Sequence, residues 1–96
     1  MVAITDIGTL IIHSPDIREG RPRIEGTGVT VHRVVGWYKL GLSPEEIAAR
    51  IGHLTLAQVY AALTYYHANR EVIEADLAKD EEEADRLVAG HGVARG

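Results

Sequence analysis

Two helix-start signals in the middle of the chain constrain its fold more than any other feature. Residues 43–46 (SPEE) place a serine at an N-cap, a proline in the first helical turn and a glutamate at capping-box spacing. Thr55 and Gln58 repeat the capping-box spacing, and Gly52 lies between the two signals as a helix end. The sequence therefore predicts two helices joined by a tight turn.

A further helix is predicted before this pair, and the last predicted helix is long. Apolar residues recur at three-to-four spacing over residues 34–42, and Gly41 suits the helix end. Neither proline nor glycine interrupts residues 55–89, which predicts one helix over most of that length. Beyond about Ala75 the helix is highly charged, so a bend or fraying is expected there, and residues 90–96 suit a loose end.

The segment GRPRIEGTGVTV, residues 20–31, combines glycines, arginines and alternating β-branched residues. A phosphate-binding loop places its glycines directly before a helix, whereas a predicted strand intervenes here. We expect short strands at residues 9–13, 23–25 and 29–31. Short edge strands favour pairing with a second copy, which predicts a homodimer.

These elements predict a mainly α fold of one domain. Its core is a three-helix helix-turn-helix unit of the winged-helix or homeodomain-like kind, with short N-terminal β-strands and a long C-terminal helix. We divide the chain of 96 residues into an N-terminal β element (1–31), a helix-turn-helix core (32–75) and an acidic helical extension with a loose tail (76–96).

Several classes of site are disfavoured by composition. The chain has no cysteine, and its five histidines include no pair three or four residues apart, so we expect no metal site and no cofactor. No serine, histidine and aspartate grouping has a recognisable catalytic context, so an enzyme is not expected. No signal peptide and no long apolar stretch are found, which predicts a cytoplasmic protein without a membrane span.

The net charge of −4 is unevenly distributed. Residues 1–72 carry seven acidic and seven basic side chains, and residues 73–96 carry seven acidic and three basic ones, which sum to the totals of 14 and 10. The acidic end suits a basic partner or water, and the neutral body is compatible with nucleic acid.

A helix-turn-helix unit can place its second helix in the major groove of DNA. On this hypothesis Thr55 and Gln58 face the base edges, while Arg33, Lys39 and Arg50 reach phosphates.

The predicted reading helix also has features that leave DNA binding open. Its small residues Ala61 and Ala62, expected to face outward, would let DNA approach closely. However, it contains no arginine or lysine before Arg70. A helix-turn-helix that binds only protein therefore stays an alternative.

The chain has no phenylalanine, so its tyrosines must supply much of the aromatic core. Tyr38, Tyr60 and Tyr66 are predicted to be core residues. Either Trp37 or Tyr65 is expected to be exposed at an interface.

The chain resembles a bacterial family catalogued as a domain of unknown function and associated with antitoxins of type II toxin–antitoxin pairs (VapB-like). The resemblance covers about residues 12–66. The matching motifs are residues 20–22, Ile24, residues 26–27, residues 29–31, residues 41–47 and residues 54–55. Glu25 and Gly28 stand where the family usually has arginine.

This resemblance implies an antitoxin that neutralises a toxin, often a PIN-like nuclease, and binds the promoter of its own operon. The toxin contacts are then expected on the last helix, at the apolar Leu77, Leu87 and Val88 and in the acidic run at Glu81 and Glu82. Two alternatives stay open: a stand-alone transcription regulator, and a protein–protein adaptor that does not bind DNA.

Overall fold

The computed structural model describes residues 4–95, with side chains described through Val88. Four α-helices follow a short sheet: α1 (Val31–Lys39), α2 (Pro44–Ile51), α3 (Leu56–Ala68) and α4 (Arg70–Arg95). The sheet pairs β1 (Ile11–Ile12) with β2 (Arg23–Ile24). A mainly helical fold with short N-terminal strands is therefore confirmed, although the strands are shorter than predicted.

Both predicted capping boxes are present. The Ser43 hydroxyl accepts from the Glu46 backbone N–H at 3.2 Å, and the Glu46 carboxylate accepts from the Ser43 N–H at 2.9 Å. Thr55 and Gln58 make the equivalent bonds at 3.2 and 2.8 Å. Gly52 ends α2 in the left-handed conformation, with φ of 85°. Local sequence thus fixes where α2 ends and where α2 and α3 begin.

The third predicted strand, residues 29–31, is reduced to one bridge between Thr30 and Arg23. The Thr30 side chain instead accepts from the Arg33 N–H at 3.1 Å and caps α1, which begins at Val31. The chain turns from strand into helix at this threonine because its hydroxyl satisfies a free N–H of the first turn.

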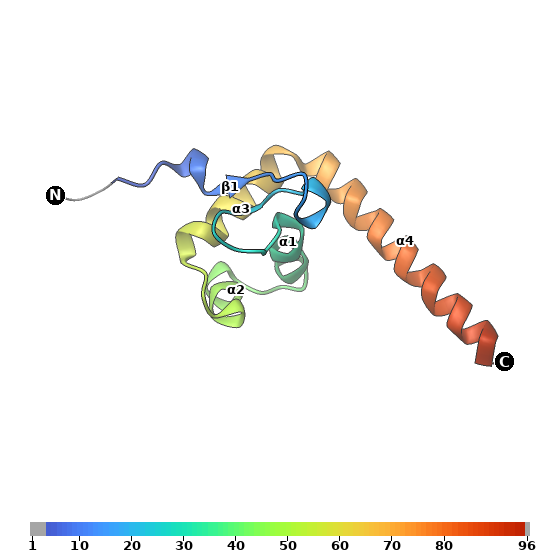
Figure 1. Cartoon of the computed structure of the whole chain (residues 1–96). Helices are drawn as coiled ribbons and strands as arrows, with labels where there is room; N and C mark the ends of the chain where they lie inside the picture. Colours follow the sequence, from blue (N-terminus) through green and yellow to red (C-terminus); the bar gives the residue numbers. More distant parts are fainter. Residues whose placement is uncertain (1–3, 96) are drawn as a thin grey trace.

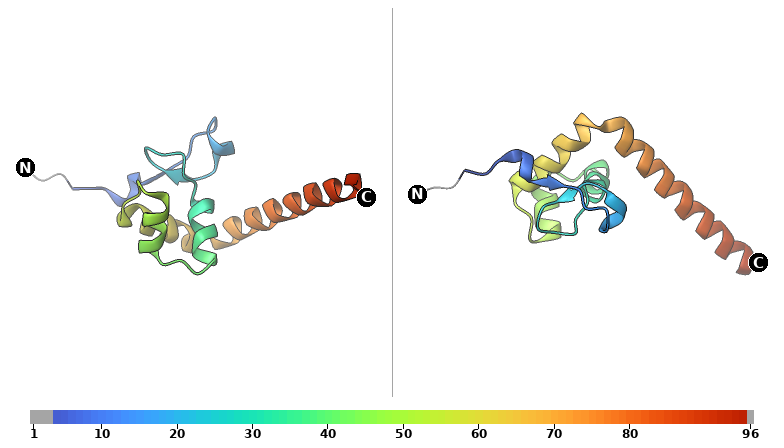
Figure 2. Two further views of the ribbon diagram at one scale, coloured as in Figure 1. Left: turned by 90° about the horizontal axis from the view of Figure 1, so that it is seen from below. Right: turned by 45° about the horizontal axis from the view of Figure 1, so that its top comes forward.

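The core lies where α1, α2 and α3 meet (Figure 2). Both α1 and α2 pack on α3, and the small sheet also contacts α3. The largest fully buried side chains are Ile24, Ile47, Ile73, Val31, Val34, Val35 and Val59. Every element from β2 to the first turns of α4 thus contributes to one cluster.

The prediction of one continuous helix after Thr55 is wrong, because the helix breaks at Asn69 (φ −130°, ψ 38°). The Asn69 side chain donates to the Tyr65 carbonyl at 3.1 Å and so satisfies the end of α3. The change of direction brings Ile73 into the core with an exposure of only 1%. Burial of this side chain favours the break over a straight helix.

After the break, α4 continues to Arg95, through most of the segment expected to be loose, and Gly96 lies outside the described residues. No helix in the described part of the chain is both long and apolar enough to cross a membrane.

The tyrosine predictions hold for one residue of three. Tyr66 is buried, whereas Tyr38 and Tyr60 are 38% and 50% exposed. Trp37 and Tyr65 are both half-buried against the core. The aliphatic residues of α1, α2 and α3 fill the interior, so two of the predicted core tyrosines lie at its surface.

The buried Ile73 anchors α4 to the core, and its exposed neighbour Val72 provides a matched control for this role. Replacing Ile73 with alanine should lower the free energy of unfolding by about 2–5 kcal/mol, because it leaves a cavity in the core. Val72 is 62% exposed, so Val72→Ala should change the free energy by no more than about 0.5 kcal/mol. Urea denaturation followed by circular dichroism measures both, and equal effects would contradict the anchoring role of Ile73.

Candidate functional site

The outer part of α4, from Ala78 onward, projects away from the rest of the molecule (Figures 1 and 2). The chain is consequently elongated, with extents of 65 × 28 × 22 Å. Every described side chain from Ala78 to Val88 is exposed. A helix that carries so much uncovered surface is a candidate binding element.

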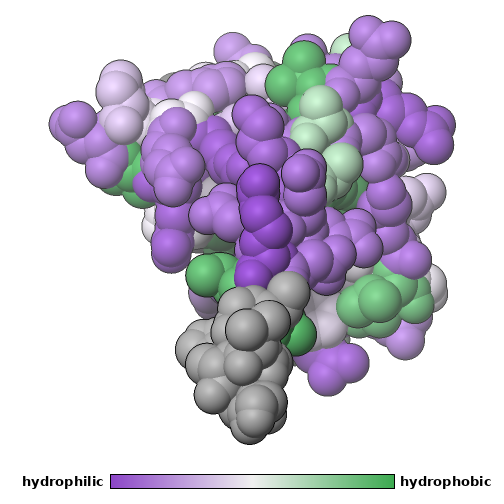
Figure 3. Space-filling model, turned by 90° about the vertical axis from the view of Figure 1, so that its right-hand side faces the viewer, coloured by the Kyte–Doolittle hydropathy of each residue, from purple (hydrophilic) through white to green (hydrophobic). Residues whose placement is uncertain are grey.

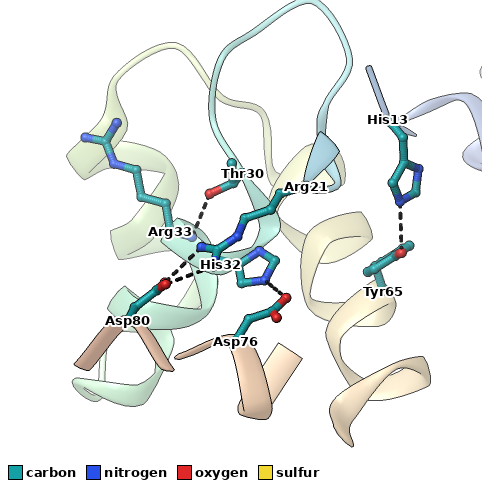
Figure 4. A network of polar contacts seen from close by, with 8 residues as sticks. All are labelled: His13, Arg21, Thr30, His32, Arg33, Tyr65, Asp76 and Asp80. Carbon is teal, nitrogen blue, oxygen red and sulfur yellow. Dashed lines mark hydrogen bonds and ion pairs between the residues drawn. The ribbon is translucent and has the colours of Figure 1, made fainter. Parts of the chain in front are cut away.

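Two polar contacts from the N-terminal half of the chain hold the base of α4 (Figure 4). The Arg21 guanidinium donates two hydrogen bonds of 2.8 Å to the Asp80 carboxylate. This pairing holds the pKa of Asp80 below its ordinary value. One helical turn earlier, Nε2 of the buried His32 lies 2.9 Å from an Asp76 oxygen, while its Nδ1 is buried without a hydrogen-bond partner among residues 4–88.

A third contact links α1 to α4. The Lys39 ammonium donates to Glu74 at 2.6 Å, and the Tyr66 hydroxyl donates to the same carboxylate. These two bonds lower the pKa of Glu74, and the bond to Glu74 raises the pKa of Tyr66. Lys39, predicted as a phosphate contact, therefore has a carboxylate partner within its own chain.

The residues predicted to bind a partner fall into two groups. Leu77 is half-buried against the core and helps to hold α4 in place. Glu81, Glu82, Leu87 and Val88 are all exposed, the last two by 63% and 70%. The outer part of α4 thus presents carboxylates beside an uncovered apolar pair.

Both predicted DNA-contacting arginines, Arg33 and Arg50, lie near one aromatic ring. The Arg50 guanidinium is 5.0 Å from the centre of the Trp37 ring, a cation–π distance. Arg33 lines a shallow pocket with Gly36, Trp37 and Leu40, and its side chain points away from the α4 contacts in Figure 4. Among residues 4–88 neither arginine forms an ion pair.

The other two predicted DNA contacts, Thr55 and Gln58, form the capping box of α3. The Gln58 side-chain oxygen already accepts the Thr55 N–H, so its amide nitrogen is the group that an external partner could contact. The prediction that Ala61 and Ala62 face outward is wrong, because they are 7% and 0% exposed. Their small side chains let neighbouring elements pack closely on α3.

The outward face of α3 consists of other residues. Leu56 and Tyr60 are 42% and 50% exposed, and Thr64 follows them one turn further along. No aspartate, glutamate, lysine or arginine occurs between Leu56 and Ala68. This face is therefore uncharged, which is unusual for a surface that contacts phosphates.

Sequence reasoning missed the role of Arg23. This arginine is 9% exposed and donates to the Thr27 carbonyl at 2.7 Å and to the Ser14 hydroxyl at 2.9 Å. It thereby connects the segment that follows β1 to the turn that follows β2. Nothing in the sequence distinguishes this buried arginine from Arg21 two residues earlier.

The face around the projecting helix is mostly hydrophilic and has only separated hydrophobic areas (Figure 3). In the described part of the chain no three histidine, aspartate or glutamate side chains gather as a metal site. The geometry thus offers three surfaces that differ in charge. They are the mainly acidic outer part of α4, the surface of α1 and α2 that carries Arg33 and Arg50, and the uncharged outward face of α3.

Comparison with known families identifies the central part of the chain. Residues 11–66 match the model of a family described as "Protein of unknown function (DUF433)". The chain belongs to this DUF433 family. The match extends from β1 to nearly the end of α3, so α4 lies outside it.

One solved structure supports the same assignment. It is the crystal structure, at 2.00 Å resolution, of a DUF433 member protein from Anabaena variabilis ATCC 29413. The TM-score is 0.68 at 30% sequence identity, and the match covers 73% of this chain and 69% of that one. No curated protein matches the chain.

The α4 anchor of this DUF433 protein should weaken in acid. Glu74 and Asp80 have lowered pKa values in the folded chain. Their ion pairs therefore contribute fully to the stability of the fold when the pH is above the ordinary carboxyl pKa values of 4.5 and 3.8. This contribution is lost as the pH falls through the lowered values. The free energy of unfolding should therefore decline from about pH 6 to about pH 3.

The pH dependence can be assigned with two double variants. Glu74→Gln with Asp80→Asn should reduce the decline, because it removes both linked carboxylates of α4. The part that remains includes Glu46, whose pKa is lowered by its bonds with Ser43. Glu81→Gln with Glu83→Gln alters two exposed carboxylates outside the anchor and should preserve the decline. An unchanged decline in the first variant would contradict the assignment.

Proposed function

We propose that this DUF433 protein is the antitoxin of a type II toxin–antitoxin pair and that it neutralises a PIN-like nuclease toxin through the outer part of α4. The observation that carries the proposal is the uncovered acidic and apolar surface of α4, presented from an anchored base. The toxin and its contacts are inferred from the chemistry of this surface and from the family resemblance.

The surface suits a protein that binds nucleic acid. Leu87 and Val88 are adjacent in sequence and exposed on a helix that is otherwise polar, so they form a small apolar patch that an apolar groove on a partner would cover. Glu81 and Glu82 lie about one and a half turns before them. A nuclease binds polyanions through basic side chains, so a groove with a basic rim and an apolar floor complements this helix.

Anchoring favours such binding energetically. An isolated helix in water is marginally stable, and a segment that must order on binding loses part of the interaction energy. The pair between Arg21 and Asp80 and the buried Ile73 hold the first turns of α4 before any partner arrives. A partner therefore has less chain to order.

We also propose that the core is a helix-turn-helix unit. The short connection between α2 and α3 and the packing of α1 on both helices support this assignment. Arg33 and Arg50, free of ion pairs among the described residues, support a contribution to promoter binding. The uncharged outward face of α3 argues against reading DNA mainly with α3.

Two other functions compete with the antitoxin. A stand-alone transcription regulator would depend on Arg33 and Arg50 and would not need α4. A protein–protein adaptor is favoured over that regulator by the uncharged face of α3. An antitoxin would need the outer part of α4 to bind its toxin, whereas a stand-alone regulator would not. Variants in this part of α4 therefore distinguish the two functions.

A capture experiment tests the antitoxin proposal. Tagged full-length protein is incubated with host lysate treated with added nuclease, and bound proteins are identified by mass spectrometry. We expect a small partner at equal stoichiometry, lost with Leu87→Asp and Val88→Asp combined but retained with Val72→Asp on the same helix. The partner expressed alone must cleave RNA and stop growth, and this chain must reverse both effects. A captured protein without toxicity would overturn the antitoxin role.

Promoter binding has a separate test on DNA from upstream of the gene for this chain. Arg50→Ala should weaken binding and reduce the slope of log affinity against log salt by about 1, because one phosphate contact is removed. Lys79→Ala removes an exposed cation from α4 and should leave the slope unchanged. An unchanged slope with Arg50→Ala would exclude that arginine from the DNA surface.

A further inference from the structure

The outward face of α3 and the groove beside it form a second unpartnered surface. On one side are the exposed Leu56 and Tyr60. On the other is an apolar groove of about 330 Å³ between α3 and the N-terminal segment. Ile7 and Ile11 line the groove from the N-terminal segment, and Ala61, Thr64, Tyr65 and Ala68 line it from α3. We propose that two copies of this chain pair through this surface, with α3 against α3 across a two-fold axis.

Charge favours this surface over the rest of the chain for contact with a second copy. The chain carries a net charge of −4, so two copies repel each other over most approaches. The segment from Leu54 to Asn69 contains no formally charged residue, so α3 itself brings no like charges together when two copies meet here. Interface centres are depleted of charge in the same way.

The shape of the surface is self-complementary. Tyr60 protrudes from the same helix that forms one wall of the groove, one turn before Thr64 on that wall. A two-fold axis relates a protrusion on each copy to a groove on the other. Each Tyr60 can then fill the groove of its partner, where Ala61 and Ala68 leave room for an aromatic ring.

The groove also has an exposed apolar edge on the N-terminal segment. Ile7 is 71% exposed at one side of the groove. An entering ring would cover Ile7 and Tyr60 together, and both would leave water in the same step. Burial of these apolar side chains from both copies supplies the driving force for association.

Other surfaces of the chain fit a second copy less well. The strands expected to pair across a dimer have only two residues each, which is too short to hold two chains together. The outer part of α4 carries an acidic run, so two such helices would repel each other. Pairing through α3 also leaves α4 free for a different partner, so the dimer does not depend on the antitoxin proposal.

Sedimentation equilibrium of the full chain tests the proposed pairing. We expect a dimer for the unaltered protein. Tyr60→Glu places a charge in each contact and should raise the dimer dissociation constant by about tenfold or more. Leu40→Glu alters a side chain on α1 that is 74% exposed and should leave the constant unchanged. Circular dichroism establishes that both variants are folded.

A second variant tests the groove without adding charge. Ala68→Trp fills the groove from its exposed side and should dissociate the dimer as Tyr60→Glu does. A monomeric unaltered protein would overturn the proposal. So would a dimer that resists both α3 variants or that dissociates with Leu40→Glu, because either result would place the interface elsewhere.

Discussion

The burial of Ile73 determines how the two ends of this chain are placed. Its side chain reaches the core only because the helix breaks at Asn69 and the chain turns. Once α4 lies in that direction, Glu74 pairs with Lys39 of α1 and Asp80 pairs with Arg21. The apolar contact selects the direction, and the polar contacts at the base of α4 restrict it further.

The glycine- and arginine-rich segment at residues 20–31 supports this arrangement. Arg21 contacts α4, Arg23 connects two turns, and Thr30 caps α1. Each of these side chains has a partner within the chain, so the segment acts as a scaffold. This part of the DUF433 match therefore specifies how the β element is joined to the helices, and the surfaces proposed for binding lie elsewhere.

The charges of the molecule are distributed by element. The outer part of α4 is mainly acidic, Arg33 lies on α1, and Arg50 lies on α2 together with the carboxylates Glu45 and Glu46. The outward face of α3 is uncharged. Such separation is compatible with the proposed antitoxin role, in which a nuclease, a second copy and promoter DNA would each contact a different surface. Lys39, which belongs by sequence with the cationic group, is withdrawn from it by Glu74.

The sequence by itself determined the features that depend on neighbouring residues. The capping boxes at Ser43 and Thr55 and the glycine end of α2 follow from bonds spanning three or four positions, so spacing alone was sufficient to predict them. Tertiary structure decided which face of α3 is buried, because its apolar residues surround the helix and Ala61 and Tyr60 are indistinguishable in pattern.

Tertiary structure also decided the break at Asn69 and the anchor of α4. Arg21 and Asp80 are 59 residues apart, and His32 and Asp76 are 44 residues apart. Their pairing depends on the path of the chain between them, which packing of the core determines. A carboxylate on an exposed helix looks the same in sequence whether water or a distant arginine is its partner.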